Sequence, residues 1–341
     1  MNVTIKDVAQ AAGVSPKTVS RVLNGEAYVR PAVKEAVLAV IATLGYKPNI
    51  AARSLASARS YLIGLVVDDP TWSAYAAGIQ LGAIKRCRDR NYHLVVEPVD
   101  TNQAESEEAL MQAIALLRLD GVILVPPLCT SASLLDRIEA IGLPYVRIAP
   151  GEQPDRSALV EIDERQAAFE LTQHLIALGH SDIGFIQGIE QHAATPQRRA
   201  GFLDAMHQAG LPVRPGRIQP GAFTFHSGLQ AGETILANDG DRPSAIFASN
   251  DDTAMGVMAA ASRLGIPVPL GLSVVGFDDA PASRIAWPDI TTVRQPLIEM
   301  AAAAVDILID PKYRLHPGDA AFRRVLPYEI IHRASVGPGP A

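Results

Sequence analysis

The sequence is poor in cysteine and contains no long hydrophobic run. Its 341 residues include two cysteines, Cys87 and Cys129, whose positions fit neither a pairing pattern nor a metal-binding spacing. Such sparse thiols are typical of a reducing compartment, so we expect both to be inert core residues. No apolar segment is long enough to cross a membrane, and the first residues are charged rather than signal-like. We therefore expect a cytoplasmic chain with no membrane partner.

The sequence also lacks the motifs of familiar enzymes. It has no nucleophile elbow, no phosphate-binding loop and no spacing of histidines and carboxylates that is typical of a metal centre. We therefore expect no catalytic residue, no metal and no cofactor, and binding is the simpler function.

Charge is divided unevenly along the chain. Residues 1–60 contain eight Lys or Arg and three Asp or Glu, a net charge of +5. The whole chain has a net charge of −6, so the remaining residues carry −11. A basic head on an acidic body is expected when only the head contacts phosphates, although a solvated charged face gives the same count. The length of 341 residues, 48% of them hydrophobic, favours two or three domains.

Residues 4–24, TIKDVAQAAGVSPKTVSRVLN, predict two short helices joined by a tight turn. The first begins at a capping box of Thr4 and Asp7, and its apolar residues recur at helical spacing. Gly13 supplies the turn, and Ser15 caps a second helix that begins at Pro16. This arrangement is a helix-turn-helix unit, whose second helix enters the DNA major groove, although ordinary core packing uses the same spacing.

The second helix has a polar face and an apolar face. Lys17 and Arg21 lie four residues apart on the polar face, where long cations reach guanine edges. Hydroxyl groups suit phosphates, and this helix offers three of them, on Ser15, Thr18 and Ser20. A third helix over residues 31–44, which ends at Gly45, completes a three-helix head.

The string from Thr4 to Asn24 resembles the amino-terminal signature of the lac repressor family. The resemblance implies a DNA-binding head over residues 1–47. The DNA-contacting residues that it implies are Thr4, Ser15, Pro16, Lys17, Thr18, Ser20, Arg21, Asn24, Tyr28, Arg30, Asn49, Arg53 and Leu55. Arg30 departs from the family, because a small capping hydroxyl is usual at this position. Pro16 and Lys17 occupy variable base-reading positions, so the operator sequence cannot be copied from a relative.

Residues 48–60 form an unusual linker, with a short alanine-rich helix that is marginal in water on its own. In the lac repressor family the matching segment is a hinge helix that pairs with its dimer mate and inserts a leucine into the minor groove. The resemblance gives this role to Leu55, which would bend the duplex by unstacking a base step. The alternative is that Leu55 docks on the body of the protein.

From Leu62 onward the sequence alternates short β-rich runs with helical stretches. This alternation predicts parallel, doubly wound sheets. The expected strands are residues 62–67, 92–97, 121–125 and 145–148, and then 182–186, 244–248 and 273–277. The two groups predict an α/β body with two lobes, like that of periplasmic binding proteins, and a ligand cleft at the carboxyl ends of the strands.

Acidic residues follow several of these strands, at Asp68 and Asp69, Asp251 and Asp252, and Asp278 and Asp279. Such clusters suit a metal ion or an acid/base pair. They also cap helices, and this is the favoured interpretation for Asp252 and Asp279. Ligand recognition by the cleft is the simplest account of the rest.

The resemblance to the lac repressor family continues through the body, in strings such as TPQRRAGF (195–202), SNDDTAMG (249–256) and VVGFDD (274–279). It implies a first lobe of residues 61–161 and 292–323 and a second lobe of residues 163–289 and 325–332. The chain then crosses between lobes near Ile162, Ile290 and Arg324. Residues 333–341 contain no leucine heptad, and we expect a frayed tail.

The effector-binding residues that the resemblance and the cleft imply are Asp69, Trp72, Tyr75, Asp163, Arg198, Phe223, Asn250 and Asp278, with Trp287 a weaker candidate. A guanidinium and carboxylates pair with adjacent hydroxyls and a ring covers an apolar face, so the set fits a sugar, although a nucleoside would use the same groups. We therefore expect a homodimeric transcriptional repressor that binds a near-palindromic double-stranded DNA operator under control of a small-molecule effector. A solute-binding protein or a sugar-processing enzyme on the same two-lobed body are the alternatives.

Overall fold

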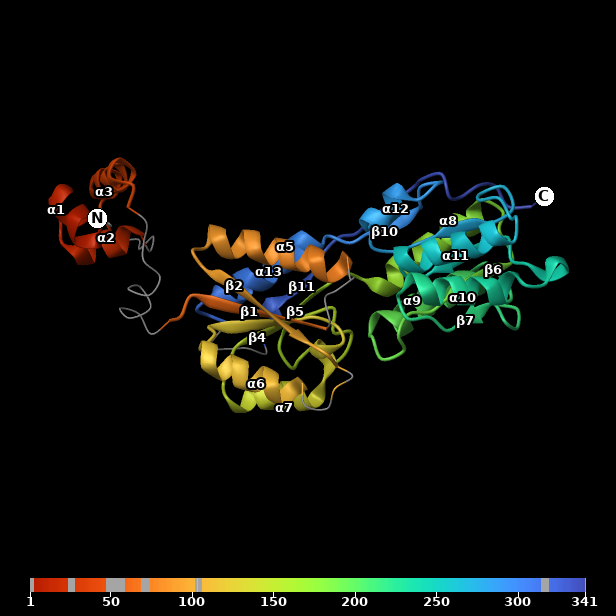
Figure 1. Ribbon diagram of the computed structural model, residues 1–341, viewed down its shortest axis with the longest axis horizontal. Coiled ribbons are helices and arrows are strands. Elements are labelled where there is room, and N and C mark those ends of the chain that lie inside the picture. Colours follow the sequence, from red (N-terminus) through yellow and green to blue (C-terminus); the bar gives the residue numbers. More distant parts are fainter. Residues whose placement is uncertain are drawn as a thin grey trace. The chain divides into compact units, whose positions relative to one another are not determined.

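The computed structural model describes residues 3–23, 28–46, 59–68, 74–101, 103, 106–313 and 319–340. The chain divides into two compact units, one up to Tyr61 and one from Leu62 onward, drawn in Figure 1. We describe each unit by itself.

The described residues of the first unit form a head of three helices, α1 (Ile5–Ala11), α2 (Pro16–Leu23) and α3 (Pro31–Leu44). Its core is small and aliphatic, because one residue of each helix, Val8, Val19 and Val37, is fully buried. Gly13 and Gly45 take left-handed conformations, with φ of 64° and 61°, where the chain leaves α1 and α3. The predicted three-helix head is confirmed for the described residues.

The first lobe of the second unit is built on a six-stranded parallel sheet in the order β11-β5-β4-β3-β1-β2. Its strands are β1 (Leu62–Asp68), β2 (His93–Val99), β3 (Gly121–Leu124), β4 (Tyr145–Ile148), β5 (Ala158–Glu161) and β11 (Arg323–Val325). Helices cover both faces of the sheet, as Figure 1 shows. These helices are α5 (Ala74–Asp89) and α13 (Leu297–Ile309) on one face, and α6 (Ser106–Leu117) and α7 (Ala132–Ala140) on the other.

The second lobe contains a four-stranded parallel sheet in the order β7-β6-β8-β9. Its strands are β6 (Ile183–Ile186), β7 (Ile218–Gln219), β8 (Ala245–Ala248) and β9 (Ser273–Val275), and its helices are α8 (Glu164–Ala177), α9 (Ala194–Gln208), α10 (Phe225–Leu236), α11 (Asp251–Arg263) and α12 (Pro281–Ile285). Successive residues of β6 face opposite sides: Ile186 packs in the cluster of α10 and α11, while the Phe185 ring lies 5.0 Å from that of Phe202 on α9. The predicted doubly wound fold is therefore confirmed.

Three short connections join the lobes, and two lie later in the chain than expected. The first follows β5, as predicted near Ile162. Ile290 lies in the core of the second lobe, and the chain stays there through β10 (Thr292–Arg294), since the Asp278 amide donates to the Val293 carbonyl at 2.8 Å. Arg324 lies inside β11, paired with Val160 of the first lobe, so the third connection follows β11. It leads to β12 (Glu329–Ile331), which pairs with β10 in an antiparallel ribbon.

The expectation of a frayed tail is wrong for residues 333–340, which pack along the second lobe. Ser335 is fully buried, and its hydroxyl donates to the Val274 carbonyl at 2.6 Å while the Val274 amide donates to the Ser335 carbonyl at 3.0 Å. Further along, the Gly339 amide donates to the Leu178 carbonyl at 2.7 Å. The tail is ordered because it satisfies the backbone groups at the free edge of β9.

Both cysteines are free and buried, and burial raises the pKa of each thiol to about 12. Among the described helices, none has the length and apolar character that spanning a bilayer requires.

Candidate functional site

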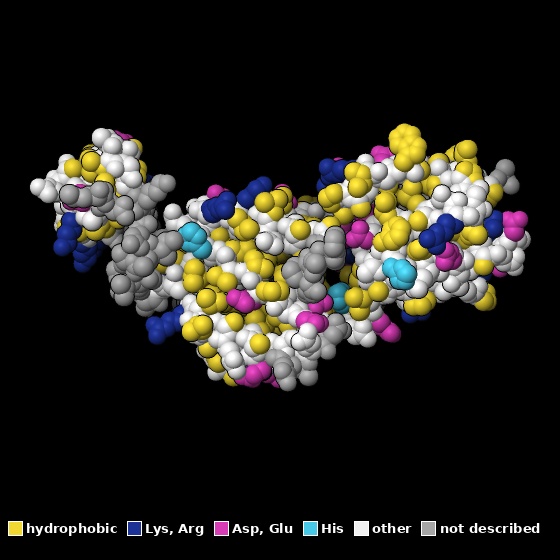
Figure 2. All heavy atoms as spheres, viewed as in Figure 1, with side chains coloured by type: hydrophobic (Ala, Val, Ile, Leu, Met, Phe, Trp, Pro, Cys, Tyr) yellow, Lys and Arg dark blue, Asp and Glu magenta, His cyan; other side chains and the backbone are white. Residues whose placement is uncertain are grey.

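The second helix of the head presents a basic face. Lys17 and Arg21 are exposed on α2, opposite the buried Val19 and Val22. Figure 2 shows lysine and arginine side chains gathered on one side of the head. The helix is anchored by Ser15, whose hydroxyl accepts a hydrogen bond from the Thr18 amide at 3.1 Å.

The remaining head residues that we predicted to contact DNA occupy surface or near-surface positions where the structure describes them. Thr4 is exposed at the start of α1, and its amide and hydroxyl both donate to Asp7, at 2.8 and 2.7 Å. Tyr28 is 95% exposed, and the exposed Arg30 precedes α3 without capping it. The other members of the set are the exposed Pro16 and the half-buried Ser20. Asn24, Asn49, Arg53 and Leu55 lie outside the described residues, as does most of the expected hinge.

In the body, the candidate ligand site is organised around Arg198 of α9, which is 3% exposed. Its Nε donates to Glu164 Oε2 at 2.7 Å, and its Nη1 donates to the Ser249 carbonyl. Its guanidinium carbon lies 3.6 Å from the centre of the Phe277 ring. The guanidinium is therefore held in one place by an ion pair, a hydrogen bond and an aromatic face.

Asp278 follows β9 and faces the same guanidinium, with 3.8 Å between its Oδ1 and Arg198 Nη2. Gln295 Nε2 donates to this oxygen at 2.7 Å. Burial raises the pKa of Asp278 to about 7, although Arg198 and Gln295 favour the ionised form. The site thus holds a hydrogen-bond acceptor whose charge changes near neutral pH.

Phe223 and Asn250 form one unit beside the arginine. The Phe223 ring sits against Gly188, where an added Cβ would lie 1.9 Å from it, and its centre is 5.9 Å from the Arg198 guanidinium carbon. The Asn250 amide is already used, because its nitrogen donates to the Phe223 carbonyl at 2.9 Å and its oxygen caps α11 through the Thr253 amide. Asn250 therefore positions the ring.

The first lobe contributes Tyr75 of α5. Its hydroxyl is buried and has no hydrogen-bond partner among the described residues. Its pKa is raised by burial and by the nearby Glu164 and Asp278. Side chains from both lobes therefore meet around Arg198. Asp69 and Trp72 lie outside the described residues.

Two other candidates do not contact Arg198 directly. Asp163 caps α8 by accepting from the Gln166 amide at 2.9 Å, and it lines a cavity of about 240 Å³ together with Glu161 and with Glu164, the ion-pair partner of Arg198. Trp287 is 95% exposed, so it is not a core residue.

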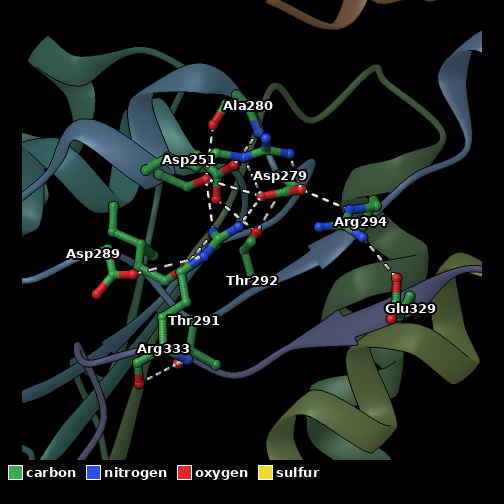
Figure 3. A network of polar contacts seen from close by, with 12 residues as sticks. Asp251, Asp279, Ala280, Asp289, Thr291, Thr292, Arg294, Glu329 and Arg333 are labelled. Atoms are coloured by element: carbon green, nitrogen blue, oxygen red, sulfur yellow. Dashed lines mark hydrogen bonds and ion pairs between the residues drawn. The ribbon is translucent and has the colours of Figure 1, made fainter.

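Two other acidic residues at the strand ends, Asp251 and Asp279, hold the scaffold, as Figure 3 shows. Asp251 accepts from the Ala280 amide and the Thr292 hydroxyl, both at 2.7 Å. The expectation that Asp252 and Asp279 act as helix caps is wrong, because Asn250 caps α11 and the Asp279 carboxylate pairs with arginines.

Sequence reasoning missed three members of the site. Glu164 follows Asp163 at the end of the first connection, Phe277 precedes Asp278, and Gln295 precedes the second connection. Glu164 and Gln295 carry polar groups beside strand ends, and this position is the one sequence signal that could have identified them as site residues.

Comparison with known proteins agrees with both parts of the chain. Residues 4–49 match the lacI family of bacterial regulatory proteins, and residues 172–336 match the periplasmic binding protein-like domain. The chain is 35% identical over 309 residues to catabolite control protein A of Priestia megaterium, which covers 90% of this chain and 92% of that protein. It is 34% identical over 307 residues to the HTH-type transcriptional repressor PurR of Actinobacillus pleuropneumoniae serotype 3 (strain JL03), with 90% of each chain covered.

Solved structures resemble the whole chain as well. The transcriptional regulator CelR in complex with cellobiose has a TM-score of 0.74 at 30% identity, and covers 98% of this chain and 100% of its own. The lac repressor dimer bound to operator and the anti-inducer ONPF has a TM-score of 0.74 at 27% identity, and covers 99% and 100%. These relatives are regulators of transcription rather than enzymes, and the chain belongs to the lacI family of bacterial regulatory proteins.

Proposed function

We propose that this protein is a cytoplasmic repressor that binds a near-palindromic DNA operator as a homodimer, and that a small sugar-like ligand in its cleft controls the operator affinity. The observation that carries the ligand-binding half is the buried Arg198, which is surrounded by Glu164, Asp278 and the unpartnered Tyr75 hydroxyl. Burying a guanidinium, a carboxylate and a hydroxyl without a partner costs folding free energy, and such groups are typical of a ligand-binding site.

The DNA-binding half rests on α2. Its exposed cations, Lys17 and Arg21, extend from a face that Val19 and Val22 hold against the head core. An α-helix with such a face fits the major groove, where cations contact guanine edges and phosphates. The lac repressor structure is a dimer on its operator, and two-fold symmetric half-sites follow if this chain also pairs.

The sugar-like ligand is supported by the site and by the relatives. Hydroxyl pairs suit Arg198 and Asp278, and the Phe223 ring beside them suits the apolar face of a sugar ring. CelR was solved with cellobiose. Control of DNA binding then requires that the ligand favour one arrangement of the lobes, with a coupling free energy of about 1–3 kcal/mol.

Footprinting on DNA from beside the protein's own gene tests the proposal. We expect protection of two inverted half-sites whose centres lie roughly one or two helical turns apart. Sugars added to the same reaction should include at least one that strengthens or weakens the protection. A folded protein that protects no sequence at low salt would contradict the proposal, and so would protection that every sugar leaves unchanged.

A further inference from the structure

We propose that the ligand of the Arg198 site is an uncharged polyhydroxyl compound, which the Tyr75 hydroxyl and the Gln295 side-chain oxygen recognise, and that phosphorylated or acidic sugars are rejected. This inference rests on the ligand-binding half of the proposed function.

Two buried polar atoms at this site have no hydrogen-bond partner in the part of the chain that the structure describes. One is the hydroxyl of Tyr75, and the other is Oε1 of Gln295, a residue that is 4% exposed. The nitrogen of the Gln295 amide is already engaged, because it donates to Asp278 Oδ1 at 2.7 Å. Buried polar atoms without partners are rare because each loses its hydration, so the pair marks places where a ligand supplies the missing hydrogen bonds.

Both atoms border Asp278, but they come from different parts of the body. Tyr75 lies on α5 of the first lobe, where the charges of Glu164, Asp278 and Arg198 all act on its hydroxyl. Gln295 follows β10 at the connection that leads from the second lobe to α13. A ligand that satisfies both atoms therefore bridges the two lobes.

The charges of the site disfavour an anion. The cation that faces Asp278 is Arg198, and its Nε and Nη2 already face Glu164 while its Nη1 donates to the Ser249 carbonyl. Arg294, the backbone bridge partner of Asp278, pairs through its side chain with Asp279. Nearby His192 packs beside Phe223, and burial lowers its pKa, which disfavours its cationic form. Glu164 alone balances the charge of Arg198, and Asp278, whose pKa burial raises to about 7, adds negative charge when it is ionised, so a phosphate or carboxylate would meet no uncompensated positive charge.

The hydrogen-bonding groups lead to the same ligand class. Asp278 and Gln295 Oε1 accept hydrogen bonds, and the Tyr75 hydroxyl either accepts or donates one. A surface rich in acceptors needs a ligand rich in donors, and adjacent hydroxyl groups supply several donors without charge.

A thermal-shift panel tests the ligand class. The panel pairs neutral pentoses, hexoses, disaccharides and sugar alcohols with the phosphate or uronic acid of the same compound. We expect at least one neutral compound to raise the Tm of the full-length protein, and its charged counterpart to raise it less or not at all. Binding confined to the anionic members, or binding of no neutral member, would overturn the inference, whereas footprinting would still test the DNA-binding half of the proposed function separately.

Tyr75→Phe tests the first of the two atoms. Removing a hydroxyl that has no partner should leave the Tm of the ligand-free protein unchanged or raise it, while the affinity for the ligand found in the panel falls about tenfold. Tyr313→Phe is the matched control, because the buried Tyr313 hydroxyl donates to the Tyr145 carbonyl. It should lower the Tm and leave ligand affinity unchanged. If Tyr75→Phe behaves like Tyr313→Phe, the hydroxyl has a structural role and the assignment is wrong.

Gln295→Leu tests the second atom, with Gln112→Leu on the exposed surface of α6 as its control. Gln295→Leu should weaken the neutral ligand at least tenfold, as measured by calorimetry, and Gln112→Leu should not. Because Gln295→Leu also removes the donor to Asp278, ligand-free unfolding curves establish that each variant is folded. A folded Gln295→Leu variant with unchanged affinity would remove Gln295 from the site.

Discussion

Asp278 and Asp279 follow the same strand with the same side chain, yet their carboxyl groups have opposite pKa shifts. Burial raises the pKa of Asp278 to about 7, and Arg198, which lies 3.8 Å away and is shared with Glu164, offsets only part of this rise. Three arginines around Asp279 hold its pKa well below the usual range despite burial. Asp278 therefore remains available to a ligand, while Asp279 is engaged by the arginines around it.

The most informative single residue of the head is Arg21, on the exposed face of α2. If it reads a guanine edge, Arg21→Ala should cost about 1–3 kcal/mol of binding to the best operator and relax the preference at one base pair. Competition binding with operators substituted at each position measures both effects.

Arg263→Ala is the control for this change. Arg263 is an exposed arginine on α11 that pairs with Glu233, so its loss alters the net charge equally without touching the head. An Arg21→Ala variant that loses affinity equally for every sequence would show a phosphate contact instead.

At the scale of elements, Asp279 ties three segments to the second lobe. Its carboxylate, which is 1% exposed, accepts from Arg284 of α12 at 2.6 Å and from Arg294 of β10 at 2.7 Å, and it also pairs with Arg333 after β12. Figure 3 shows Arg294 reaching from Asp279 to Glu329 on β12. The two strands next to the lobe connections are therefore fixed through one carboxylate.

Asp279→Asn should lower the free energy of unfolding at neutral pH by about 2–4 kcal/mol, because the nearly buried Arg333 loses its charged partner. A depressed pKa stabilises the fold above the pKa of the unfolded chain, about 4, and this stabilisation is lost as the pH falls below that value. The deficit of the variant should therefore be full at pH 7 and shrink toward pH 3. Thermal unfolding between pH 3 and 7 measures it.

Asp289→Asn is the matched control, since Asp289 is 45% exposed and lies 3.9 Å from Arg333. We expect this control to change stability by less than about 0.5 kcal/mol. Equal and pH-independent losses in both variants would show that Asp279 contributes through packing alone.

The secondary-structure elements also differ in how well the sequence predicts them. Strands β1, β3, β4, β6 and β8 were predicted to within one residue at each end because each is a buried run of β-formers. Strands of two or three residues, such as β7, β10 and β12, carry no periodic signal, and their pairing partners are distant in sequence. The same reason explains the shifted connections and the ordered tail, whose Ser335 is buried only because β9 has a free edge.

The sequence predicted site residues that lie in the strings shared with the lac repressor family. It did not predict residues that come close to Arg198 only when the chain folds. Arg198, Phe223 and Asp278 were expected, and they lie together. Gln295 was not expected, because no local pattern shows that it faces Asp278. Asn250 was assigned to the ligand, whereas the structure uses both ends of its amide to hold Phe223 and α11.

At the scale of the whole molecule, the chain combines a basic head with an acidic body that encloses a polar site. The net charge of +5 over residues 1–60 favours phosphates, and the net charge of −11 over the rest keeps the body away from DNA. We infer that the body acts on DNA through the lobe connections and the linker rather than by direct contact.

The central claim is that ligand and operator binding are linked, and one pair of titrations tests it directly. Operator affinity is measured with and without saturating ligand, and ligand affinity with and without operator, at one salt concentration. Linkage requires both affinities to change by the same factor, which we expect to be roughly 5- to 150-fold. An operator affinity that saturating ligand leaves unchanged, in a protein that binds both, would contradict the account.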